Sequence, residues 1–144
     1  MPIALACHKG IGPAVSGTAL VAQDNFSARY DLDRIKGTFS RPAHKLHGRR
    51  VSGATSLIVT TSPEIKFAAD RMGLTRRIED AGGIVAGGVC FYQMYAREMA
   101  EANGWQRLLT NSAKLVNIIG GYGYKPTLAS MERCIDSAVA GKVL

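Results

Sequence analysis

The stretch Ser56-Leu57-Ile58-Val59-Thr60-Thr61-Ser62-Pro63 decides the fold. A short apolar run, typical of a buried strand, ends in hydroxyl side chains, and Ser62-Pro63 is a favourable N-cap and first-turn pair for a helix. Two further apolar runs end in a similar way, one at Gly87-Gly88-Val89-Cys90 and one at Thr110-Asn111-Ser112-Ala113-Lys114. Because repeated βα units form a parallel sheet with right-handed crossovers, the sequence predicts an α/β fold.

Apolar spacing of three and four residues predicts the helices that follow these runs. One helix begins at Ser62-Pro63, is interrupted at Gly73 and ends at Gly82-Gly83. Further helices are predicted from Phe91 to Ala102, from Ser112 to Gly120-Gly121, and after Ser130, with strands over Ile84–Val89, Trp105–Leu109 and Pro126–Leu128. The carboxyl ends of parallel strands form the crevice where ligands bind, so we expect the three polar motifs to converge on one rim.

Residues 1–55 show no helical period. Thr18–Ala22 is a strand candidate, whereas Gly37–Gly48 contains Pro42 and turn residues. We therefore predict a small doubly wound parallel sheet in residues 56–144, with a β-rich segment, residues 1–55, packed against it.

The net charge of +7 is concentrated near the N-terminus. Residues 1–55 carry eight Lys and Arg against three Asp, and residues 56–144 carry ten against eight acidic side chains. A basic nucleic-acid binder using residues 29–50 is one interpretation, but no nucleic-acid motif is present. Attraction of an anionic substrate or of an acidic partner surface explains the charge more simply. No apolar run is long enough to span a bilayer and no leader is evident, so we expect a cytoplasmic protein without a membrane span.

The chain has three cysteines, Cys7, Cys90 and Cys134. An odd number without a CxxC pair argues against a disulfide framework and a self-contained zinc site. Cys90 lies at the predicted carboxyl end of a strand, where a thiolate can ligate iron or zinc, although cysteine is also a common core residue. Cys134 falls on the apolar side of the last helix, which favours a structural role.

The motif from Thr110 to Lys114 predicts an anion site. Backbone N–H groups at a helix N-terminus, with the positive end of the helix dipole, suit a carboxylate or a phosphate. The positive charge of Lys114 in the first turn is unfavourable next to the positive end of the helix dipole. Its presence there is explained either by an anionic ligand or by a side chain that is simply solvated. Three hydroxyl side chains have two possible roles, either as ligand-binding groups or only as helix caps: Ser112 here, and Thr61 and Ser62 in the first motif.

At these residues the chain resembles the aconitase X family of dehydratases. Residues 57–144 resemble the C-terminal part of the large, catalytic subunit or domain. The matching segments are Thr61-Ser62, Gly88-Val89-Cys90, Thr110–Lys114 (complete agreement with a "TNSAK" segment), Glu132-Arg133-Cys134 and Ala138–Gly141. Residues 16–53 resemble the start of the family's small swivelling domain, at Gly17–Val21, Phe26-Ser27 and His44–Gly48.

The resemblance implies a hydro-lyase that removes water from a hydroxy acid, of the hydroxyproline or the phosphorylated mevalonate type. It implies an iron–sulfur cluster or iron, with Cys90 as a metal ligand. It also implies that Thr61, Ser62, Thr110, Asn111, Ser112 and Lys114 bind the small anionic hydroxy-acid substrate. The family's other cluster cysteines have no match, and neither does the loop that supplies the serine proposed as base.

These departures leave two functions to compare. In one, the chain is a component of an aconitase-X-like hydro-lyase whose site is completed by a partner subunit or by a homo-oligomer. In the other, it is a non-catalytic module that binds a small anion or a partner subunit.

Overall fold

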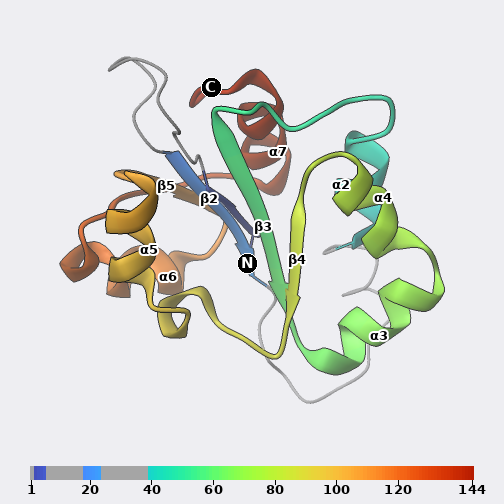
Figure 1. Ribbon diagram of the computed structural model, residues 1–144, viewed down its shortest axis with the longest axis horizontal. Helices are drawn as coiled ribbons and strands as arrows, with labels where there is room; N and C mark the ends of the chain where they lie inside the picture. The colour runs from blue at the N-terminus through green and yellow to red at the C-terminus, as the bar shows by residue number, and fades with distance from the viewer. Residues whose placement is uncertain (1, 6–17, 24–38) are drawn as a thin grey trace.

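The computed structural model describes residues 2–5, 18–23 and 39–144 and folds them around one six-stranded sheet (Figure 1). The strands are β1 (Pro2–Leu5), β2 (Thr18–Gln23), β3 (Thr55–Thr61), β4 (Ile84–Gly87), β5 (Arg107–Thr110) and β6 (Lys125–Leu128). Parallel pairings join them in the order β4–β3–β2–β5–β6, and β1 pairs antiparallel with β3 and β5. The predicted parallel sheet and the strand at Thr18–Ala22 are confirmed.

Helices cover both faces of this sheet. They are α2 (Arg41–Lys45), α3 (Pro63–Arg71), α4 (Leu74–Asp80), α5 (Ala96–Asn103), α6 (Ala113–Ile118) and α7 (Met131–Ala140), with short 3-10 turns η3 (Phe91–Gln93) and η4 (Gly120–Tyr122). In Figure 1, α2, α3 and α4 lie to the right of the strands and α5 and α6 to the left. None of the described helices is both long and apolar enough to cross a bilayer.

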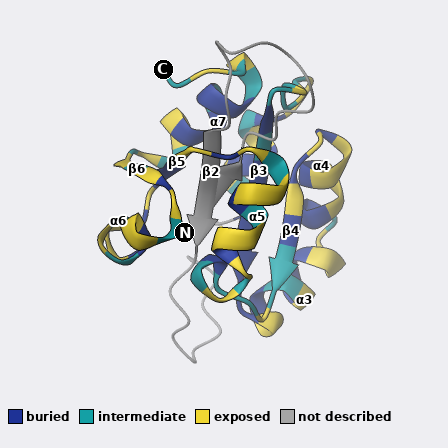
Figure 2. Ribbon diagram, turned by 60° about the vertical axis from the view of Figure 1, so that its left-hand side comes forward, coloured by how far each residue is buried: buried dark blue, intermediate teal, exposed yellow. Residues whose placement is uncertain are grey.

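Alternation along β3 produces two separate cores, because successive side chains of a strand point to opposite faces. Leu57 and Val59 join a core with α2, α3, α4 and α7, whereas Ile58 joins a second core with η3, α5 and α6. In Figure 2 the buried positions of α5 lie on the side that faces the strands. The sheet is therefore doubly wound, as predicted.

Three helices begin at the serines that the sequence predicts as caps. The hydroxyl oxygens of Ser62, Ser112 and Ser130 each accept a hydrogen bond from the backbone N–H three residues later. Each bond satisfies an amide that has no partner within its own helix, and a cap of this kind contributes about 1 kcal/mol.

The predicted continuous helix from Phe91 to Ala102 is wrong. The chain instead makes the turn η3, and Tyr95 then adopts a left-handed backbone with φ of 54° before α5 begins at Ala96. Tyr95 is the one non-glycine residue with positive φ in the described part of the chain. Apolar periodicity continues across this break, so the sequence pattern alone does not reveal it.

The expectation of no helix in residues 1–55 is also wrong. Arg41–Lys45 forms α2, with Pro42 in its first turn, where proline costs no hydrogen bond. Phe39, Ala43 and Leu46 are buried in the same core as α3 and α7. A helix of five residues is too short to establish a 3.6-residue period, which is why the pattern missed it.

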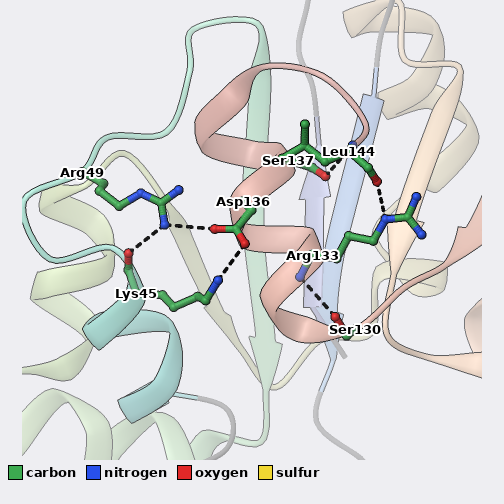
Figure 3. Close-up of polar contacts among 7 residues, drawn as sticks. All are labelled: Lys45, Arg49, Ser130, Arg133, Asp136, Ser137 and Leu144. Atoms are coloured by element: carbon green, nitrogen blue, oxygen red, sulfur yellow. Dashed lines mark hydrogen bonds and ion pairs between the residues drawn. The ribbon is translucent and has the colours of Figure 1, made fainter.

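Two kinds of contact tie residues 45–55 to the helices. The carboxylate of Asp136 on α7 accepts hydrogen bonds from Lys45 Nζ at 2.7 Å and from an Arg49 guanidinium nitrogen at 3.0 Å (Figure 3). Further along the chain, the Val51 amide donates to the Ala81 carbonyl at 2.7 Å. The Ser52 amide and the Thr55 hydroxyl both donate to the Ala138 carbonyl, at 2.9 and 2.5 Å.

Candidate functional site

The first predicted motif lies at the carboxyl end of β3 and is buried. Thr60 and Thr61 are 0 % exposed and Ser62 is 8 % exposed. Ser62 caps α3 through both of its oxygens: its hydroxyl accepts from the Ile65 amide at 3.4 Å, and its carbonyl accepts from the Lys66 amide at 3.0 Å. The structure thus gives Ser62 a definite capping role, and any ligand role comes in addition to it.

The second motif packs directly against the first. Gly87 pairs with Thr61, and the Gly88 amide donates to the Thr61 carbonyl at 2.9 Å. Gly88 has φ of 75°, and a Cβ there would lie 3.3 Å from Cγ of Pro63, so glycine suits this position on two grounds. Gly88 therefore lies against the start of α3, and Cys90, which is half-buried, follows it two residues later in the chain.

The third motif lies at the end of β5. Thr110 is fully buried and its hydroxyl accepts from the Ser112 amide at 3.2 Å, while the Ser112 hydroxyl accepts from the Leu115 amide at 3.1 Å. Asn111 and Lys114 are exposed. The first-turn amides of Ala113 and Lys114 have no carbonyl within their own helix to bond, so the exposed part of this motif offers N–H donors and one cation.

The register of the sheet separates the third motif from the other two. Strand β2 lies between β3 and β5, and its pairings with Val59 and Thr110 put Thr110 level with Ile58, three residues short of Thr61. At about 4.8 Å between strands and 3.3 Å per residue, the two strand ends are about 10 Å apart across the sheet and about 10 Å along it. The structure places Thr61 and Ser62 beside Gly87 and Gly88, and Cys90 follows two residues later in the chain. Thr110, Asn111, Ser112 and Lys114 form a second group.

The described residues do not fit an iron–sulfur cluster. Among residues 2–5, 18–23 and 39–144 there is no group of three or more His, Cys, Asp or Glu that could hold a metal ion. Cys134 is fully buried in the core beneath α7, where burial raises the pKa of its thiol to about 12. Because the thiolate is the metal ligand, that environment opposes ligation. Cys7 lies outside the described residues, so Cys90 is the one candidate ligand that the structure places at the rim.

Sequence reasoning missed an aromatic cluster formed between η3, α5 and η4. The Tyr122 hydroxyl donates to the Tyr92 hydroxyl at 2.7 Å, and the Arg97 guanidinium lies 5.5 Å from the centre of the Tyr122 ring. Arg97, Trp105 and Tyr122 border a cavity of about 380 Å³ beside the amino end of β5. The segment Gly120–Tyr124 reads from sequence only as a helix end and turn, so no signal pointed to this cluster.

Comparison with known proteins identifies the family. A family model described as the aconitase X third domain matches residues 38–140. The chain belongs to the aconitase X family. The sequence resemblance is therefore confirmed, and the matched range also includes His44–Gly48, the segment that the sequence relates to the small domain. No curated protein sequence matches this aconitase X chain.

A solved structure supports the same fold. The chain is similar to the crystal structure of Thermococcus kodakaraensis aconitase X in its holo form, with a TM-score of 0.59 and 21 % sequence identity. The match covers 83 % of this chain and 28 % of that protein. This member of the aconitase X family thus spans about a quarter of the length of the relative and corresponds to part of it.

Proposed function

We propose that this chain is the third-domain component of an aconitase-X-type hydro-lyase that dehydrates a small hydroxy acid of the hydroxyproline or phosphorylated mevalonate type. The observation that carries the proposal is the match of residues 38–140 to the family's third domain, with the complete TNSAK segment at the end of β5. The match covers 28 % of the T. kodakaraensis protein, so a complete enzyme of this type needs parts that lie outside these 144 residues, and we propose a partner subunit or a homo-oligomer as one source of them.

Within this proposal, the motif at the end of β5 binds the anionic groups of the hydroxy acid. The exposed Lys114 supplies positive charge, the amides of Ala113 and Lys114 supply N–H donors, and Asn111 supplies an amide side chain. Thr110 and Ser112 hold this turn in shape through the bonds to the Ser112 and Leu115 amides. A carboxylate or phosphate has the charge and the acceptor oxygens that such a turn recognises.

The motifs at the ends of β3 and β4 form the other half of the proposed site. Thr61 and Ser62 contribute hydroxyl groups, and Cys90 is one ligand of an iron centre or an iron–sulfur cluster. A cluster needs several thiolates in fixed geometry, so the other ligands would come from outside the residues described here. None of the matched residues is a candidate for the catalytic base, so we propose that the base, like the other metal ligands, lies outside the matched segments.

The alternative is a non-catalytic module that binds a small anion or a partner subunit through the same turn. The observation that favours it is the lack of a metal-binding group across the described ranges. Both functions require the turn from Thr110 to Lys114, and they differ in whether Cys90 matters.

The test is an amide-resolved NMR titration of the whole chain with phosphorylated mevalonate and with hydroxyproline. We expect saturable shifts of the Ser112–Leu115 amides, lost in Lys114→Ala and retained in the control Lys142→Ala, which removes an exposed lysine elsewhere. Shifts confined to other parts of the chain, or equal effects of the two variants, would overturn the assigned site.

Iron distinguishes the two functions. After anaerobic reconstitution, iron and acid-labile sulfide are measured in the wild type and in Cys90→Ala, each alone and with the companion polypeptide once that is identified. Iron retained by the wild type and lost in Cys90→Ala supports the hydro-lyase component. Iron binding that is identical in the two proteins under both conditions supports the anion-binding module.

A further inference from the structure

The cavity beside the amino end of β5 is separate from the three polar motifs. It has a volume of about 380 Å³, and its lining comes from α5, from the segment that leads into β5 and from η4. The turn from Thr110 to Lys114 begins at the other end of β5, which at about 3.3 Å per residue is about 10 Å away. A ligand held in this cavity therefore occupies a second site.

Two opposite charges border the cavity. Arg97 and Glu101 both lie in its lining and are both exposed, and a spacing of four residues puts them on one side of α5. They are the two charged residues of the lining, which is otherwise formed by Ala, Gly, Gln, Trp and Tyr. The lining thus has no net charge, although the whole chain carries +7.

The two charges do not neutralise each other. The Arg97 guanidinium donates to the Gly121 carbonyl at 3.0 Å and lies 5.5 Å from the centre of the Tyr122 ring. A guanidinium has five N–H donors, so Arg97 is held in place and still has donors for a carboxylate. Glu101 forms no ion pair or hydrogen bond through its side chain among the residues that the structure describes. The cavity therefore presents a fixed cation and a carboxylate without a partner.

The apolar part of the lining contains a hydrogen-bond donor that is not used. Trp105 is 6 % exposed, and its indole N–H is buried without a hydrogen-bond partner in the described part of the chain. A buried N–H without a partner is rare and costly, so this one indicates an acceptor that the chain itself does not supply. Ala100 and Tyr122 add apolar surface beside it.

We propose that this cavity binds a free α-amino acid with an apolar or aromatic side chain. Arg97 binds its carboxylate, Glu101 binds its ammonium group, and its side chain packs near Trp105. A simple anion would be repelled by Glu101 and a simple cation by Arg97, so the pair favours a zwitterion over either. The volume of about 380 Å³ falls within the range of small-molecule sites, roughly 300–1,000 Å³.

The test uses the fluorescence of Trp105, the single tryptophan of the chain, during titration with L-phenylalanine. We expect a saturable change, and amide-resolved NMR should show saturable shifts at Gly121 and Gly123, which also border the cavity. N-acetyl-L-phenylalanine lacks the ammonium group and L-phenylalaninamide lacks the carboxylate. Each should bind about tenfold or more weakly than phenylalanine, because each leaves one charged group of the site without its partner.

Two variants assign the charged contacts. Arg97→Gln and Glu101→Gln should each weaken phenylalanine binding about tenfold or more, whereas Arg107→Gln and Glu98→Gln, at exposed positions outside the lining, should leave it unchanged. In Glu101→Gln the acetylated ligand should bind as well as phenylalanine does, and in Arg97→Gln the amide ligand should do so. Circular dichroism checks that all four variants fold.

Three results would overturn the proposal. They are the absence of any saturable change in both fluorescence and the Gly121 and Gly123 amides, equal affinity for the three ligands, and equal effects of the lining and control variants. None of them bears on hydroxy-acid binding, which is read at the Ser112–Leu115 amides beyond the opposite end of β5.

Discussion

Replacement of Phe39 by alanine tests whether the segment before β3 is part of the fold's main core. Phe39 is 0 % exposed and belongs to the same cluster as α3 and α7. An aromatic side chain buries on the order of 150–250 Å², which at about 25 cal/mol per Å² amounts to roughly 4–6 kcal/mol, part of which the alanine methyl retains. We therefore expect Phe39→Ala to lower the free energy of unfolding by about 3–5 kcal/mol.

Urea denaturation measures this loss with two probes. Trp105, the single tryptophan, is buried in the core on the other face of the sheet, so its fluorescence reports that core, while circular dichroism reports the helices as a whole. If the two cores unfold together, both transitions move to lower urea by the same amount. Separate movement would show that the sheet does not couple the two cores.

Two further variants serve as controls for Phe39→Ala. Phe67→Ala removes the same ring from a site that is 63 % exposed, and should change stability by no more than about 0.5 kcal/mol. Phe39→Leu keeps much of the volume and should cost about 1–2 kcal/mol, which remains measurable if the alanine variant is largely unfolded. A Phe39→Ala loss below about 1 kcal/mol, or one equal to that of Phe67→Ala, refutes the reasoning.

Three other perturbations follow from the structure. Hydrogen bonds from Lys45 and Arg49 lower the pKa of Asp136. This carboxylate therefore stabilises the fold above its unfolded pKa of about 3.9, and it loses that contribution as the pH falls through its lower folded pKa. Urea denaturation should show that Asp136→Asn costs about 1 kcal/mol of unfolding free energy at pH 7 and little at strongly acidic pH. Tyr95→Gly relieves a left-handed backbone at a side chain that is 77 % exposed, and should raise the thermal midpoint through a gain of about 0.5–1 kcal/mol, whereas a lower midpoint would mean that the Tyr95 ring makes a needed contact. Because burial raises the pKa of the Cys134 thiol to about 12, an alkylating reagent should modify Cys90 before Cys134 and should reach Cys134 only at the rate of unfolding, as mass spectrometry can measure.

The sequence predicted the elements whose signals are local and redundant. Ser62, Ser112 and Ser130 each stand before an amphipathic run, and the cap, the period and the preceding strand agree. The alternation that sends Ile58 to one face and its neighbours to the other could not be read beforehand, because a strand that is buried on both faces is apolar throughout.

The misses have physical causes of their own. The helical turn after Phe39 is too short for a period, and the backbone reversal at Tyr95 interrupts an apolar pattern that continues on both sides of it. For the site, the sequence placed the polar motifs at strand ends, but their separation depends on register. The three-residue stagger between Thr61 and Thr110 is set by strand pairing, and no residue of either motif encodes it.

The bonds made by residues 51–55 have a consequence for any shortened form of the protein. The carbonyls of Ala81 and Ala138 lie at the C-terminal ends of α4 and α7, where a helix has no partner for them. Both are satisfied by amides and a hydroxyl from the segment that leads into β3. A chain trimmed to start at residue 56 would keep every residue of the three polar motifs. However, the carbonyls at the ends of α4 and α7 would lose their hydrogen-bond donors, and the core would lose the Phe39 side chain. The smallest piece of this chain that can fold therefore extends well before the first motif that carries its chemistry.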